Sequence, residues 1–184
     1  MAVPVLTSLD IKPGALVFCH SVGFVGRAIR IAQWINGKLR PSRWKAKGCP
    51  YNHVAMIDRP SADGKDWLVI QAEAHGVTND KFLSSIAPGG HYEIIPLPAG
   101  IDAMRALQFA RSQVSSRYGV LTIVNIIFNI LTPRLIHIDI TRGGTWICSA
   151  VMAESVRFGG WLHSWDNVYE VMPSDLYFAL PNLS

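Results

Sequence analysis

The chain is short of charged residues and of cysteine. Only 16% of its 184 residues are charged while 49% are hydrophobic, which excludes a disordered chain and is typical of a compact globular protein. Three cysteines are an odd number, which argues against a disulfide scaffold and favours a reducing compartment or a free reactive thiol. The length suits one domain over residues 1–184 with a substantial core.

Long hydrophobic runs are also lacking. The most apolar stretch, residues 120–131, is shorter than the ~20 residues that a membrane-spanning helix needs, and two asparagines interrupt it. We interpret it as a buried helix, with a strand as the alternative because it is rich in β-branched residues. The first ten residues lack the basic and apolar segments of a secretory signal, so we expect a protein that is cytoplasmic as synthesised.

Acidic residues are missing from the stretch 38–48, which carries five basic side chains. It is either a solvated loop or a landing patch for an anionic polymer, in keeping with the net charge of +4. No recognised nucleic-acid motif accompanies it, so we expect no nucleic-acid partner. Cys19, His20, Cys49 and His53 offer zinc-ligand types, but their separations are irregular, and we expect neither a metal nor a cofactor.

Hydrophobic periodicity predicts strands mainly in the first half of the chain and helices mainly in the second. Strands are expected at 15–19, 51–57, 67–75, 91–96 and 168–171. Helices are expected at 23–35, 79–85 and 101–117, in a segment that has Cys148 in its first turn and ends near Gly159, and from Pro173 onward. This order predicts the α+β class, with an antiparallel sheet packed against helices.

Cys148 is the first candidate for chemistry. Thr145 is a candidate N-cap, which would put Cys148 in the first turn of its helix, where the helix dipole favours a negative charge. A thiol becomes a nucleophile only as the thiolate, and an imidazole with an orienting polar group stabilises that form. The alternative interpretation of Cys148 is a small buried apolar residue.

The strand expected at 67–75 supplies polar partners. Side chains alternate along a strand, so Gln71 and Glu73 share one face while Ile70 and Ala72 share the other. We expect the small apolar face to meet the core, and the polar face to present Gln71 and Glu73 beside His53.

Four blocks occur in a fixed order: KPGALVF at 12–18, YNHVAM at 51–56, VIQA at 69–72 with Gly-Val at 76–77, and WICS at 146–149. Another, SRYG at 116–119, precedes the last block. Together they resemble the circularly permuted NlpC-type branch of the papain-like cysteine hydrolases, in which the catalytic histidine precedes the cysteine. Three positions depart from the family pattern, because this chain has Ala15 where Asp is common, Gln71 where Glu is frequent and Ala150 where Glu is usual.

The resemblance implies a papain-like fold with Cys148 as nucleophile and His53 as base. The third polar residue is Gln71 or Glu73, and we favour Glu73 because a carboxylate stabilises an imidazolium more strongly. Backbone N–H groups near Ser149 would bind the oxyanion, and Tyr118 is either a further donor or a packed aromatic.

The resemblance further implies that the enzyme cleaves amide bonds through a thioester, with bacterial cell-wall peptides as the usual substrates. A cell-wall substrate would require delivery by a phage particle, a lysis pore or a secretion device. Alternatives are an acyl-ester or thioester lipid hydrolase or acyltransferase on the same fold, and an inactive binding module.

Overall fold

The computed structural model describes residues 11–20, 30–31, 49–73, 75–88, 91–118, 145–161, 168 and 171–180. Of the helix expected at 23–35, only residues 30–31 are described, and they are helical. The basic stretch 38–48 and the apolar stretch 120–131 lie outside the described residues.

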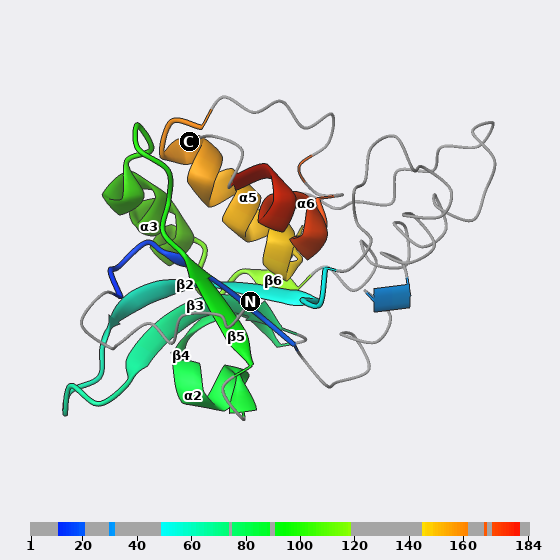
Figure 1. Cartoon of the computed structure of the whole chain (residues 1–184). Coiled ribbons are helices and arrows are strands. Elements are labelled where there is room, and N and C mark those ends of the chain that lie inside the picture. Colours follow the sequence, from blue (N-terminus) through cyan, green and yellow to red (C-terminus); the bar gives the residue numbers. More distant parts are fainter. Residues whose placement is uncertain are drawn as a thin grey trace, which may run out of the picture.

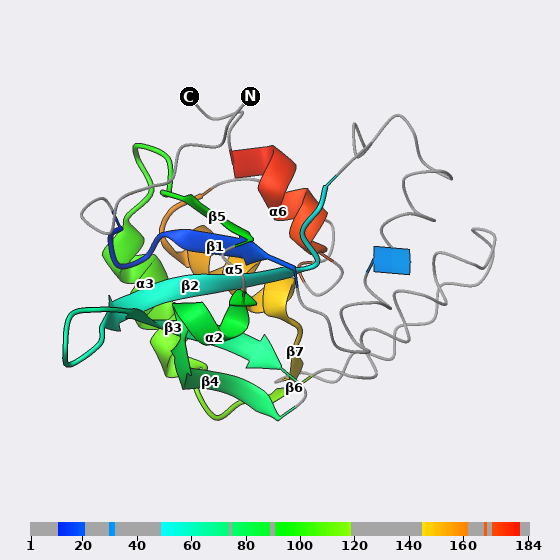
Figure 2. The same cartoon turned by 60° about the horizontal axis from the view of Figure 1, so that its bottom comes forward.

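Five strands form one antiparallel sheet in the order β4-β3-β2-β1-β5 (Figures 1 and 2). The strands are β1 (Leu16–Cys19), β2 (His53–Pro60), β3 (Trp67–Glu73), β4 (Gly76–Phe82) and β5 (Tyr92–Ile95). A separate parallel pair joins β6 (Arg117–Tyr118) to β7 (Thr145–Trp146). The expected antiparallel sheet is therefore confirmed.

Helices cover both faces of this sheet, unequally. Figure 1 shows α3 (Ala103–Ser112), α5 (Cys148–Phe158) and α6 (Pro173–Ala179) on one side, with the single turn of α2 (Leu83–Ile86) on the other. The α+β class is confirmed. Within the described ranges, no helix combines the length and the apolar character needed to cross a membrane.

The core has two parts because both faces of the sheet are buried. Alternate residues of the central strands, such as Met56 and Ile70, pack against α5, and their neighbours, such as Ile57 and Val69, pack toward α2. Gln71 is itself fully buried. The face of β3 that carries Gln71 is thus partly apolar, since Val69 belongs to the second core cluster, and Gln71 lies beside His53 as expected.

The predicted helix over 79–85 is wrong for most of its length. Residues 79–82 continue β4, and only the turn at Leu83–Ile86 is helical. The chain reverses at Gly76, whose φ of 119° lies in the region that favours glycine, so that β3 and β4 pair as a hairpin. Cross-strand pairing thus overrides the local sequence preference of this segment and determines its conformation.

Two further boundaries differ from expectation. The helix predicted over 101–117 begins after its Asp102 cap as expected, but it ends at Ser112. The chain then turns at Ser115 (φ 74°), whose N–H donates to Val77 O at 2.8 Å, so a tertiary contact stops the helix. Of the strand expected at 168–171, the two described residues, 168 and 171, are not in a strand.

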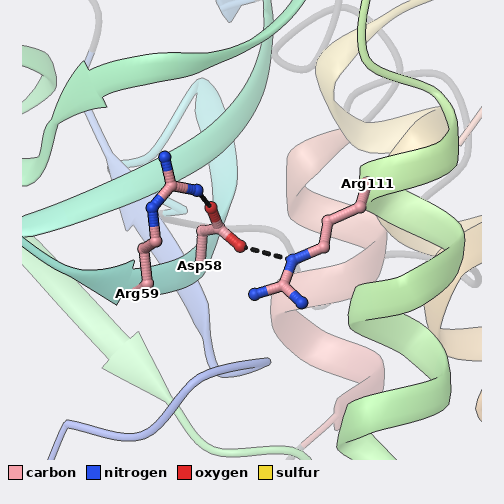
Figure 3. A network of polar contacts seen from close by, with 3 residues as sticks. All are labelled: Asp58, Arg59 and Arg111. Carbon is pink, nitrogen blue, oxygen red and sulfur yellow. Dashed lines mark hydrogen bonds and ion pairs between the residues drawn. The ribbon is translucent and has the colours of Figure 1, made fainter.

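A buried carboxylate joins α3 to the far end of β2 (Figure 3). Arg111 Nε donates to Asp58 Oδ1 at 2.7 Å, and Arg59 donates to the other oxygen, Oδ2. Asp58 is fully buried, whereas the two arginine side chains are 43% and 51% exposed. Both carboxylate oxygens therefore have a cationic partner, which makes this burial tolerable.

Candidate active site

Cys148 is the first residue of α5, and it is buried at 1% exposure. The N-cap is Ile147, not Thr145, because the backbone of Thr145 belongs to β7 and pairs with Arg117. The predicted cap is thus wrong, although the predicted helix start is close. An isoleucine side chain has no oxygen to bind the amides of the first turn, so no cap residue competes with an anion there.

His53 lies at the start of β2, and Gln71 lies near the end of the neighbouring strand β3. The pairing of β2 with β3 runs from Met56–Ile70 to Pro60–Trp67, so it stops short of both residues. Here a side-chain contact takes over, since His53 Nε2 lies 2.8 Å from Gln71 Oε1 and both side chains are buried. An amide oxygen only accepts, so Nε2 carries the proton and Nδ1 is the nitrogen left for another partner.

The environment of Cys148 favours the thiolate. Burial raises the pKa of this thiol, but the charge of His53 and a hydrogen bond with it, together with the backbone N–H groups of Val54 and Ser149, lower it below its usual value. The N-terminal end of α5 adds a positive dipole at the same place. These surroundings favour the thiolate of Cys148, which also belongs to the larger core cluster.

The pKa of His53 moves in the opposite direction. Burial lowers it, but the charge of Cys148, hydrogen bonds with Cys148 and Gln71, and the charge of Glu73 raise it above its usual value. A thiol pKa that falls and an imidazole pKa that rises favour the same state, a thiolate beside an imidazolium.

The structure brings Gln71, and not Glu73, into contact with the imidazole. The side chain of Glu73 is exposed, and among the described contacts none is a hydrogen bond from His53 to the Glu73 carboxylate. Glu73 is the last residue of β3 and pairs with Gly76 at the hairpin turn, so its carboxylate acts on His53 only through its charge.

Ser149 and Tyr118 were the expected oxyanion or substrate residues. The Ser149 hydroxyl is fully buried and donates to Val171 O, so this side chain faces the protein interior and only its backbone N–H reaches the sulfur. Tyr118 lies in β6, where it pairs with Trp146, two residues before Cys148. Its side chain lies outside the described part of the chain.

The other two thiols differ from Cys148. Cys19, which pairs with His53 across β1 and β2, is buried, and burial and the charges of Cys148 and Glu73 raise its pKa to about 12. Burial likewise raises the pKa of Cys49. Within the described ranges, no three His, Cys, Asp or Glu side chains group as a metal site.

Two features of the site were missed in the sequence. The Val54 N–H was overlooked, although Val54 directly follows His53. Trp146 was treated only as part of a motif, yet its Nε1 donates to Gln113 Oε1 at 2.9 Å and its ring meets Phe109 edge-on. Trp146 thereby fixes the start of α5 against α3.

No protein-family model matches the chain, and no curated protein matches its sequence. The family resemblance therefore depends on the blocks quoted above. Taken alone, the geometry combines an ionisable sulfur, an imidazole held by an amide, and backbone donors at a helix start. This set is suited to nucleophilic attack on an acyl group.

Proposed function

We propose that the chain is a cysteine hydrolase with the circularly permuted, NlpC-type papain-like fold, and that it cleaves amide bonds through a thioester. Cys148 is the nucleophile, His53 the base and Gln71 the residue that orients His53. The chain order of His53 before Cys148 and the antiparallel sheet against which α5 packs support this assignment.

One observation carries the proposal. His53 is bound at Nε2 by Gln71, and the pKa values of His53 and Cys148 are displaced in opposite directions by their mutual interaction. His53 takes the thiol proton, the thiolate attacks the acyl carbon, and the imidazolium then protonates the leaving amine. Water, deprotonated by His53, releases the acid from the thioester and restores the thiol.

The start of α5 supplies the donors for the oxyanion. The first backbone bond of the helix runs from Val151 N–H to Ile147 O, so the amides of residues 148–150 precede the helical ladder. No side-chain cap occupies this end, and the Ser149 N–H already binds the sulfur. The free N–H groups and the positive end of the helix dipole are therefore available to the negative oxygen that develops in the tetrahedral intermediate.

For the substrate we propose the peptide crosslinks or stem peptides of bacterial cell wall. A phage particle or a secretion device would deliver such an enzyme to its polymer. A lipid ester or thioester would pass through the same thioester intermediate, so only the reaction products can identify the acyl donor.

The test is mass spectrometry of purified peptidoglycan and of acyl-ester lipids after incubation with the protein. We expect new peptide termini from peptidoglycan, and Cys148→Ala should release none. Cys49→Ala is the matched control, since it removes a half-buried thiol whose pKa is raised, and it should retain full activity. Lipid products would move the proposal to the acyl-ester class. The absence of any Cys148-dependent product from both sources would contradict the proposal.

A further inference from the structure

Two buried polar atoms beside the proposed catalytic set lack a hydrogen-bond partner. They are Gln71 Nε2 and Thr78 Oγ1, and no other side chain in the described part of the chain has such an atom. A buried polar atom without a partner lowers the free energy of unfolding, so native proteins seldom retain one without a reason.

The two atoms belong to neighbouring residues. Gln71 on β3 is the direct register partner of Thr78 on β4 (Figure 2 shows the two strands side by side). Directly opposed residues of an antiparallel pair project to the same face, with Cβ atoms about 4.5–5.5 Å apart. The hydroxyl and the amide, which both lack a hydrogen-bond partner, therefore lie on the same face of directly paired residues and can serve as partners for each other.

The two ends of the Gln71 amide have different tasks. Oε1 accepts from His53, so the NH2 group points away from the imidazole, toward the remainder of the sheet face that Gln71 shares with Thr78. If the amide rotated by half a turn, the NH2 group would meet the Nε2–H of His53, with one donor against another. A group that accepts from the NH2 end therefore selects the orientation that His53 needs.

We propose that Thr78 is a positioning residue, whose hydroxyl oxygen accepts from Gln71 Nε2 and so keeps Oε1 directed at His53. This inference rests on the proposed function, since it assigns a role in the same Cys148–His53 pair. A small rotation of the Thr78 side chain, or one intervening water, completes the link. Thr78 does not touch the reacting atoms and acts through Gln71 alone.

The experiment is the pH profile of Cys148 alkylation by iodoacetamide, followed by peptide mass spectrometry. Thr78→Val removes the hydroxyl at nearly constant shape, and Thr78→Ser retains it. We expect the pH of half-maximal labelling to rise by about 0.5 to 1 unit in Thr78→Val and to stay unchanged in Thr78→Ser. Thermal unfolding by circular dichroism checks the fold, and Thr78→Ala replaces Thr78→Val if the latter does not fold.

A double-mutant cycle identifies the route of the effect. In a Gln71→Ala background, Thr78→Val should add no further shift, because the amide that it anchors is gone. An equal shift in both backgrounds, an equal shift in the Ser and Val variants, or a Thr78→Val profile that coincides with the wild type would each overturn the inference. If wild-type Cys148 labelled only in the alkaline range of Cys49, the proposed function itself would fail, which is a distinguishable result.

Discussion

Strand β2 carries a buried ionisable side chain near each end, and the two are satisfied in different ways. At Asp58 both carboxylate oxygens bind guanidinium groups that are charged at every relevant pH (Figure 3). At His53 one ring nitrogen binds the neutral amide of Gln71, and the other is left for a thiol that can lose a proton. The first arrangement is complete without a reaction, and the second becomes an ion pair only when a proton moves.

This difference separates a structural polar cluster from a reactive one. Asp58 joins α3 to the sheet, and each of its carboxylate oxygens is bound by an arginine. Under the proposed function, Cys148 and His53 exchange a proton, and an uncapped helix start lies beside them. Variants at the His53 end of β2 should therefore change the reactivity of Cys148, and variants at the Asp58 end should change the stability of the fold.

The largest effect is expected for His53→Ala. Without the imidazole the pKa of Cys148 should return to its usual value or above, because burial then acts without compensation. Alkylation of Cys148 by iodoacetamide at pH 7 should slow on the order of 100-fold, measured by peptide mass spectrometry. An alkylation rate within twofold of the wild type would show that the His53 end of β2 is no more reactive in function than the structural Asp58 end.

The pH dependence follows from the two pKa shifts. The Cys148 thiolate forms below the usual thiol range because the pKa of Cys148 is lowered, so alkylation should already be rapid near neutrality. Cleavage also needs the imidazolium, so it should decline on the alkaline side as pH rises through the raised pKa of His53, above 6.5. On the acid side it should decline as Cys148 is protonated, at a pH below the usual thiol range. Cys49, whose pKa is raised above 9.0, supplies an internal alkaline reference in the same labelling experiment.

Gln71→Ala should slow Cys148 alkylation about tenfold at neutral pH, because His53 loses the hydrogen bond at Nε2. Glu73→Gln is the matched comparison, since it removes only an exposed charge, and it should change the rate less than twofold. The reverse ranking would restore the carboxylate favoured on the sequence alone.

Asp58→Asn should leave the alkylation rate of Cys148 unchanged while it destabilises the fold. The amide keeps one accepting oxygen, so one of the two charge-assisted hydrogen bonds is lost and the other weakens. The arginines are about half exposed and regain water. We expect a loss of about 2 kcal/mol in the free energy of unfolding, measured with urea. A large change in Cys148 reactivity would show that the two ends of β2 are not independent.

Ser149→Ala should have the smallest effect. Its buried hydroxyl binds Val171 O, so its loss should cost about 1 kcal/mol of stability, again by urea unfolding. The backbone N–H that lowers the pKa of Cys148 remains, so the labelling profile should coincide with that of the wild type. A shifted profile would mean that the side chain takes part in the reaction.

Sequence patterns predicted local features well. Turn residues and apolar runs located β1 and β5, Asp102 correctly predicted the start of α3, and Pro173 the start of α6. The wrong predictions lie where tertiary pairing decides the conformation. Residues 79–82 join β3 in a hairpin, and Thr145 pairs with Arg117 instead of capping a helix.

The choice between Gln71 and Glu73 shows the same limit at the level of the site. Alternation along a strand puts both residues on one face, so periodicity could not separate them. The end of the β2–β3 pairing and the reversal at Gly76 put one residue beside His53 and the other in solvent. These are features of register, which a single sequence does not display.

The sulfur and its imidazole come from segments far apart in the chain, one at the start of β2 and the other at the start of α5. A nascent or unfolded chain therefore carries three thiols of ordinary reactivity. Cys148 is activated only when α5, near the C-terminus, packs against β2, which comes much earlier in the chain. Unfolding would return Cys148 to ordinary reactivity, so under these assignments nucleophilic attack by Cys148 is confined to the folded molecule.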